Sequence, residues 1–234
     1  MKLSKRALGV VAAVPVAGAL VFGGTARATP APQRGIDVSS YQHPGGKNIH
    51  WPSVARAGYK FAFIKDTEGN YYVNPYYASD AKSAEAAGLA VASYAFAVPN
   101  RSSGSAQASY LISHGGYSKG MLAPVLDIEW NPYGPNCYGL SPSQMASWIA
   151  SFENTVHSRT GVWATINTPS TWWNACTGKS HAFASRPLWD ENNHKSTPAH
   201  PVLPAGWTTW SYWQYSITGY VPGIAGHVDL NVRN

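Results

Sequence analysis

The sequence has few charged residues, few sulfur-containing residues and, above all, few acids. Only 12% of its 234 residues are charged, and 11 Asp and Glu stand against 17 Lys and Arg. Hydrophobic residues make up 44% of the chain. That content excludes an intrinsically disordered protein, and the length suits one large domain or two small ones.

The formal net charge of +6 belongs mostly to the N-terminus. The first 28 residues hold four cations and no anion, so the remainder carries 13 − 11 = +2; the four cations are Lys2, Lys5, Arg6 and Arg27. Binding to nucleic acid depends on concentrated positive charge. We therefore expect no nucleic-acid partner.

Beyond the N-terminus the sequence contains no apolar run long enough to cross a bilayer. The N-terminus itself has a basic start, an uncharged stretch from Ala7 to Gly24 and the small-x-small pattern Ala26-Arg27-Ala28. This order is typical of a secretory signal peptide. We predict a signal peptide over residues 1–28, a short linker over 29–34 and one folded domain over 35–234, secreted as a monomer without stable membrane association.

The chain contains only two cysteines, Cys137 and Cys176. An even number in an exported domain predicts one disulfide, and closing a loop of this length stabilises a fold by about 3 to 4 kcal/mol in the chain-entropy model. The alternative, a catalytic thiol or a metal site, is not supported by any CxxC or HExxH spacing. We expect neither a metal nor an organic cofactor.

Short apolar segments recur along the folded part and alternate with helical patterns. We predict helices over 74–88, 51–58 and 105–114, and a longer one that begins at the capping box Ser141-Pro142-Ser143-Gln144 and ends at Gly161. The predicted strands are eight, at 35–38, 61–65, 89–96, 122–128, 162–166, 187–189, 210–214 and 228–230. This alternation favours an α/β fold with a mostly parallel sheet closed into a barrel.

The second half of the sequence departs from this alternation. From Ser170 to the end there is little helical periodicity and much Pro, Gly, Asn and aromatic sequence. We therefore expect a single-domain, irregular β/α barrel with eight strands and fewer helices.

Two acids stand together at the end of one predicted strand. Asp127 and Glu129 flank Ile128, and residues i and i+2 of a strand point to the same face, about 6 to 7 Å apart. At that spacing each charge opposes ionisation of the other, and partial burial raises their pKa further. A protonated acid beside a carboxylate is what glycosidic cleavage requires.

Two further acids lie in the first and last predicted strands, Asp37 and Asp229. In a parallel barrel the first and last strands are neighbours, and active sites lie at the C-terminal mouth. We expect both acids to join Asp127 and Glu129 there. The alternative is that they are helix caps or turn residues.

The order of several motifs resembles glycoside hydrolase family 25, the Chalaropsis-type lysozymes or N-acetylmuramidases. The resemblance extends from Gly35 to Asn231 and rests on residues 37–42 (DVSSYQ), 61–69 (FAFIKDTEG), 86–89 (AAGL), 124–129 (PVLDIE), 213–215 (WQY) and 226–231 (GHVDLN). It implies a barrel with a substrate groove at its C-terminal mouth and hydrolysis of the β-1,4 bond between N-acetylmuramic acid and N-acetylglucosamine in peptidoglycan.

The resemblance also implies residue roles. Glu129 matches the general acid, Asp127 the residue that orients and stabilises the reacting centre, and Asp37 and Asp229 the other two active-site acids. Residue types alone leave open a carboxylate nucleophile or assistance by the acetamido group of the substrate.

Side chains near these motifs are candidate sugar contacts. Aromatic rings stack on sugar faces, although Tyr94 and Trp213 are equally suited to the core, and Lys65 and Glu68 either line the groove or pair with each other. The candidates are Tyr41, Gln42, Lys65, Glu68, Tyr94, Trp130, Tyr133, Trp213 and Gln214.

The chain departs from the family pattern at a few positions. Ala95 stands where the family often has His, and residues 190–193 (DENN) replace Ile-Ala and an aromatic, placing two extra acids near the groove. Residues 165–168 (TINT) also lack the common pattern. Two alternatives therefore stay open: a hydrolase of chitin-like N-acetylglucosamine polymers, and a catalytically silent glycan-binding barrel.

Overall fold

The protein is described by a computed structural model that covers residues 32–191 and 200–234, so the predicted signal peptide lies outside the described residues. The first strand begins at Gln33, inside the predicted linker, because Gln33 and Arg34 pair with Arg233 and Val232 of the last strand. The strands are β1 Gln33–Val38, β2 Phe61–Glu68, β3 Tyr72–Val73, β4 Ala90–Phe96, β5 Val125–Asp127, β6 Thr165–Thr168, β7 Leu188–Asp190, β8 Tyr212–Gly219 and β9 Val228–Arg233.

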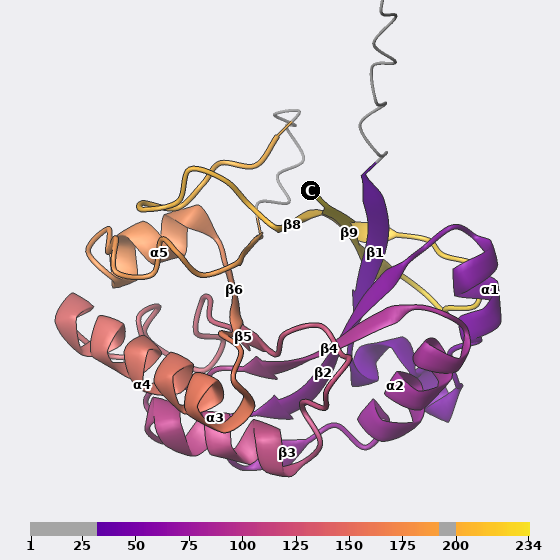
Figure 1. Ribbon diagram of the computed structural model, residues 1–234, viewed down its shortest axis with the longest axis horizontal. Helices are drawn as coiled ribbons and strands as arrows, with labels where there is room; N and C mark the ends of the chain where they lie inside the picture. The colour runs from indigo at the N-terminus through magenta and orange to yellow at the C-terminus, as the bar shows by residue number, and fades with distance from the viewer. Residues whose placement is uncertain (1–31, 192–199) are drawn as a thin grey trace, which may run out of the picture. The chain divides into compact units, whose positions relative to one another are not determined.

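The sheet closes on itself into an eight-stranded barrel. Its strands follow the order β1-β9-β8-β7-β6-β5-β4-β2, β1 pairs with β2 to complete the circle, and the short β3 adds to β2 outside it. Figure 1 shows the first strand, in indigo, beside the last, in yellow. The predicted irregular β/α barrel is confirmed.

One strand runs against the direction that the sequence predicts. β9 is antiparallel to both β8 and β1, whereas the other barrel pairs are parallel. Asp229 therefore lies near the start of its strand and Asp37 near the end of β1, and the two are direct partners in the β1–β9 register. Asp229 therefore lies at the expected mouth of the barrel, but at the start of an antiparallel strand and not at the end of a parallel one.

Helices lie on the outside of the barrel, and among the described residues all of the α-helices precede β7. They are α1 Trp51–Arg56, α2 Tyr77–Ala86, α3 Gly104–Ser113, α4 Pro142–Thr160 and α5 Ser170–Cys176. The capping box at Ser141 and Gln144 is present, and Gly161 ends α4 in a left-handed conformation with φ 78°. In this left-handed region glycine lacks the steric penalty of a side chain.

Two helix predictions need correction. Asn74 does not cap α2; its Oδ1 accepts a hydrogen bond from the backbone N–H of Tyr76 at 3.1 Å, so the chain makes a turn first and the helix begins three residues later. α5 lies where little helical pattern was visible. It follows Pro169, has no side-chain cap and is rich in tryptophan, which hides it from propensity arguments.

Hydrophobic residues pack in separate layers inside and outside the barrel. Phe61, Phe63, Trp189 and Tyr212 fill the interior with closely spaced rings. Gly35 makes room for this core, because a Cβ at that position would lie 2.2 Å from the Phe61 ring. The larger clusters lie between the sheet and its helices. None of the helices among the described residues is long and apolar enough to span a membrane.

Candidate active site

Alternation along the strands builds the site. In β2, Phe61 and Phe63 lie in the barrel core, and Lys65 continues the same face at the mouth. In β7, Trp189 lies in the core and Glu191 follows at the mouth. Because every second side chain of a strand faces inward, each apolar interior series ends in a residue at the rim of the barrel.

These rim residues surround a cavity of about 510 Å³. It contains all four acids predicted as catalytic and most of the predicted sugar contacts. The predicted residues that line it are Asp37, Tyr41, Gln42, Lys65, Glu68, Tyr94, Asp127, Glu129, Tyr133, Gln214 and Asp229.

Two predicted sugar contacts are not among the residues that line this cavity. Trp213 precedes the cavity residue Gln214 and so points the other way, where its ring packs 6.4 Å from Trp210 and 5.9 Å from Tyr215. Trp130 follows Glu129 and is 40% exposed outside the cavity lining. The same two-residue period that places Gln214 and Glu129 at the cavity turns both tryptophans away.

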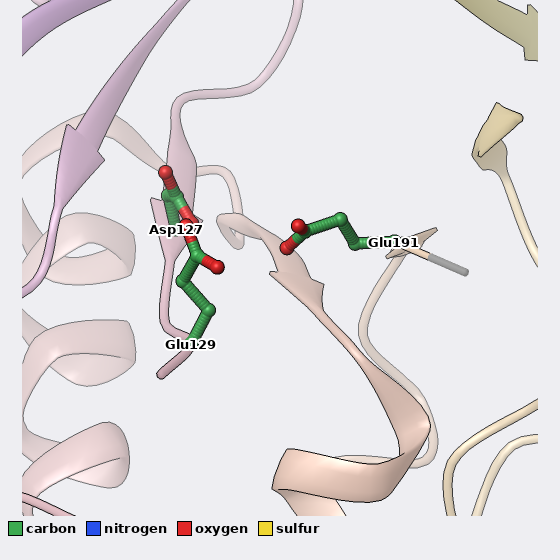
Figure 2. Close-up of side chains that lie close together, drawn as sticks. All are labelled: Asp127, Glu129 and Glu191. Carbon is green, nitrogen blue, oxygen red and sulfur yellow. The ribbon is translucent and has the colours of Figure 1, made fainter. Parts of the chain in front are cut away.

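Asp127 and Glu129 lie close together with their carboxyl groups directed into the cavity (Figure 2). Burial and the nearby charge of Glu129 raise the pKa of Asp127 well above its usual range. Burial, followed by repulsion from Asp37, raises the pKa of Glu129 to about 7. Because the two groups titrate together, the pair retains a proton near neutral pH.

A buried hydrogen-bond network fixes the acids of β1 and β9. Asn231 Nδ2 donates to Asp37 Oδ2 at 2.6 Å, and Gln214 Nε2 donates to the same oxygen at 3.1 Å. The indole of Trp189 donates to Asn231 Oδ1 at 2.8 Å, which orients the amide. Burial and the neighbouring Asp37 raise the pKa of Asp229 to about 8.

Lys65 and Glu68 do both of the things that the sequence left open, since they line the cavity and pair with each other. Lys65 Nζ lies 2.6 Å from Glu68 Oε2, and the hydroxyls of Tyr71 and Tyr133 both donate to Glu68 Oε1. Burial raises the pKa of Glu68, but these hydrogen bonds outweigh it and leave the pKa below its usual value. Glu68 is therefore ionised and holds Tyr133 at the cavity edge.

Several cavity residues were not predicted as site residues. Trp189 could have been found from strand alternation, because it occupies an inward position of a predicted strand, whereas Asn167 lies one residue beyond the predicted strand 162–166 and within β6 of the structure. The cavity residues without a predicted role are Val38, Ser39, Phe96, Pro132, Asn167, Trp189, Glu191, Ile217 and His227.

The departures from the family pattern fall on both faces of the sheet. Ala95 is fully buried in the outer core between sheet and helices, so its side chain points away from the cavity. Of the two extra acids, Glu191 lines the cavity, whereas Asp190 is fully buried. Asp190 lies two residues after Leu188 in β7 and so shares its outward face. Only one of the two reaches the groove.

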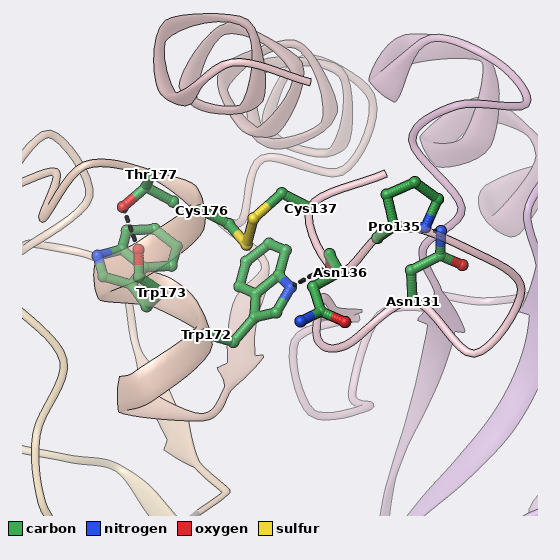
Figure 3. Close-up of a disulfide and its surroundings, with 8 residues drawn as sticks. All are labelled: Asn131, Pro135, Asn136, Cys137, Trp172, Trp173, Cys176 and Thr177. Carbon is green, nitrogen blue, oxygen red and sulfur yellow. Dashed lines mark hydrogen bonds between the residues drawn. A yellow bond between two sulfur atoms is a disulfide. The ribbon is translucent and has the colours of Figure 1, made fainter. Parts of the chain in front are cut away.

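The predicted disulfide between Cys137 and Cys176 is present, with the Cα atoms 5.2 Å apart. It joins α5 to the loop that follows β5, and Trp172 in α5 donates to the carbonyl of Asn136 in that loop at 3.0 Å (Figure 3). The same loop carries Tyr133. The disulfide thus fastens one wall of the cavity to the barrel.

One oxygen each of Asp127, Glu129 and Glu191 lies within 4.8 Å of the others, the only such grouping of potential metal ligands in the described part of the chain. Acids are also often grouped in this way without a metal, and a close carboxyl pair is what glycosidic cleavage uses.

Comparison with known proteins agrees with this geometry. The family model for glycosyl hydrolases family 25 matches residues 36–224. Lysozyme M1 of Streptomyces globisporus is 44% identical over 205 residues, which are 86% of this chain and 67% of that protein. The N,O-diacetylmuramidase of Chalaropsis sp is 37% identical over 84% of this chain and 95% of its own.

A solved structure supports the fold independently. The crystal structure of the bacterial lysozyme from Streptomyces coelicolor matches with a TM-score of 0.82 and 42% identity, over 88% of this chain and 94% of that one. A closed barrel, a cluster of acids at its mouth and a family match over most of the sequence lead to one conclusion: the chain belongs to glycosyl hydrolases family 25 and is a glycoside hydrolase.

Proposed function

We propose that this protein is a lysozyme that hydrolyses the β-1,4 bond between N-acetylmuramic acid and N-acetylglucosamine in bacterial peptidoglycan. The observation that carries the proposal is the proton-retaining pair Asp127 and Glu129 in the mouth of a barrel whose relatives are named lysozymes and muramidases.

Glu129 acts as general acid. With a pKa of about 7 it holds a proton at slightly acidic pH and transfers it to the leaving glycosidic oxygen as the bond to the anomeric carbon breaks. When the proton of the pair lies on Glu129, Asp127 is ionised, orients the reacting group and stabilises the positive charge that develops at that carbon. Water then adds to the carbon and returns a proton to the enzyme.

The remaining acids and rings hold the sugar. Asp37 and Asp229, fixed across the β1–β9 pair, complete the acid cluster. The exposed rings of Tyr41 and Tyr133 offer faces on which a sugar can stack at the cavity edge. Gln42, Gln214, Lys65 and Glu68 supply polar contacts.

The test is clearing of a bacterial cell-wall suspension, followed by identification of the new reducing ends. Muramic acid at those ends supports the proposal, and glucosamine would instead indicate a hydrolase of chitin-like polymers. Wall binding without cleavage would indicate a silent glycan-binding barrel.

Substitution Glu129→Gln removes the proton donor with little change in shape. We expect turnover to fall by about 10² to 10⁴-fold, the contribution typical of a general acid, while wall binding is retained. Substitution of the exposed Glu85 on α2 by Gln is the matched control. Unchanged turnover in Glu129→Gln would reject Glu129 as the acid.

We further propose that the protein is exported, cleaved after Ala28 and active as a monomer outside the cell, without stable membrane association. Mass spectrometry of the protein from the culture medium then finds an N-terminus at Thr29. An uncleaved chain retained in the cells contradicts this.

A further inference from the structure

Glu191 is the one departure from the family pattern that places a new carboxyl group in the cavity. Its backbone N–H donates to the carbonyl of Thr168 at 3.3 Å, which extends the pairing of β6 and β7 by one residue. Two positions before it, Trp189 points into the barrel core, so Glu191 points inward at the mouth. Figure 2 shows its carboxyl group directed across the cavity towards Asp127 and Glu129.

Asp127 and Glu191 each have one carboxyl oxygen without a hydrogen-bond partner among the described residues. Asp127 is 7% exposed, and its Oδ1 has neither solvent contact nor a hydrogen bond from any described residue. Glu191 Oε2 likewise has neither solvent contact nor a hydrogen bond from any described residue. A buried polar atom without a hydrogen-bond partner is energetically unfavourable. Both residues also line the open cavity, where a bound ligand with hydroxyl or amide groups can reach them.

Charge repulsion decides the form in which Glu191 meets that ligand. With three carboxyl oxygens within 4.8 Å of one another, the groups cannot all be ionised near neutral pH. Burial, followed by the charges of the surrounding acids, raises the pKa of Glu191 well above its usual range. The titratable groups that line the cavity around it are Asp37 in β1, Tyr41, Lys65 and Glu68 in β2, Tyr94 in β4, Asp127, Glu129, Tyr133, His227 and Asp229.

We propose that Glu191 is a substrate-binding residue whose neutral carboxyl group donates a hydrogen bond to an oxygen of a sugar bound in the cavity beside Asp127 and Glu129. The inference rests on the proposed function, because it assumes a glycan in this cavity. It distinguishes two substitutions: glutamine preserves a donor of the same length, and alanine removes it.

The first experiment measures kcat and KM on soluble peptidoglycan fragments at pH 6 for the wild type, Glu191→Gln and Glu191→Ala. We expect Glu191→Ala to raise KM about tenfold and to change kcat less than threefold, and Glu191→Gln to stay within threefold of the wild type. As the pH rises and Glu191 loses its proton, we expect KM to rise more in the wild type than in Glu191→Gln, since an amide does not ionise. An unchanged KM in Glu191→Ala, or equal losses in both variants, overturns the proposal.

The second experiment needs no turnover. Titration calorimetry compares binding of a peptidoglycan tetrasaccharide to Glu129→Gln and to the double variant Glu129→Gln/Glu191→Ala, with Glu129→Gln/Glu85→Gln as control. About tenfold weaker binding by the alanine double variant alone supports the role of Glu191, and equal affinities reject it. Wild-type turnover with equal affinities rejects this inference alone, whereas a wild type that releases no reducing ends rejects the proposed function.

Discussion

At the scale of the residue, the balance between burial and one cation sets the protonation of the proposed acid. Burial and repulsion raise the pKa of Glu129 to about 7, and Lys65 acts against them. Lys65 also lowers the pKa of Asp127, against its burial. The pair must carry a proton to catalyse. Activity is therefore highest below the pKa of about 7 and falls as the pH rises through it.

Substitution Lys65→Met removes the cation that favours proton loss. We expect the pKa of Glu129 to rise, and the basic limb of the kcat/KM profile to move upward by about one pH unit. The substitution also leaves the charge of Glu68 unpaired by Lys65, and the charge of Glu68 raises the pKa of Asp127. The profile of Lys82→Met, which lacks an exposed cation on α2, should overlay the wild type. A basic limb that stays in place or moves to lower pH would show that Lys65 does not set this pKa.

At the scale of the element, the second half of the barrel depends on a covalent link. α5 has only seven residues, too few for a helix that is stable alone. It is held by burial of Trp172 and Trp173 and by the disulfide to the loop after β5. This short, disulfide-linked helix takes the place of the longer helix that would follow the strand in a more symmetrical barrel.

Substitution of Cys137 and Cys176 by Ala removes the link across a sequence separation of 39 residues. We expect the free energy of unfolding to fall by about 3 to 4 kcal/mol, because the unfolded chain gains conformational entropy. Urea unfolding measures it, and the wild type in reductant should match the double variant. Identical midpoints for the oxidised wild type and the variant would contradict a stabilising role.

How far the sequence predicts this structure differs between elements. The helix α4 is predictable because Ser141, Gln144 and Gly161 are local signals for its two ends. Direction in a sheet is not local: nothing in residues 228–233 indicates that β9 runs antiparallel, since that depends on the whole path of the chain. The short β5 is likewise limited by its neighbours, which pair with it only over Val125–Asp127.

The same contrast between local signals and the path of the whole chain applies to the site. Asp127 and Glu129 are predictable as a pair because i and i+2 share a strand face whatever the surroundings. The distance from Glu191 to them depends on how β5, β6 and β7 close the barrel, which no spacing within the sequence records. Aromatic character does not say which face of β8 Trp213 occupies. Its position does, because Trp213 and Gln214 are adjacent in the strand and therefore point to opposite faces.

At the scale of the whole molecule, a chain with few acids has buried several of them. Burial raises the pKa of Asp66 to about 8, and burial, partly offset by Arg186, raises that of Glu153 to about 8. Asp229 and Glu129 in the cavity are raised in the same direction. A raised pKa means that the folded protein holds the proton more tightly than the unfolded chain. The contribution of these acids to stability is therefore complete below their pKa in the unfolded chain, near 4, and declines as the pH rises towards 8.

Asp66 is the sharpest case, because it is fully buried and neither carboxyl oxygen has a hydrogen-bond partner among the described residues. Between pH 5 and 8 we expect the free energy of unfolding to fall with pH, by up to about 1.4 kcal/mol per unit for each such group. In Asp66→Ala the slope should be shallower and the protein more stable than the wild type at pH 8, since an ionised buried carboxylate is gone. Urea unfolding at several pH values tests this, with the exposed Glu85→Ala as control. A wild type whose stability is constant or increases over this range, or an Asp66→Ala variant with the wild-type slope, would show that Asp66 does not exchange its proton on unfolding as its burial requires.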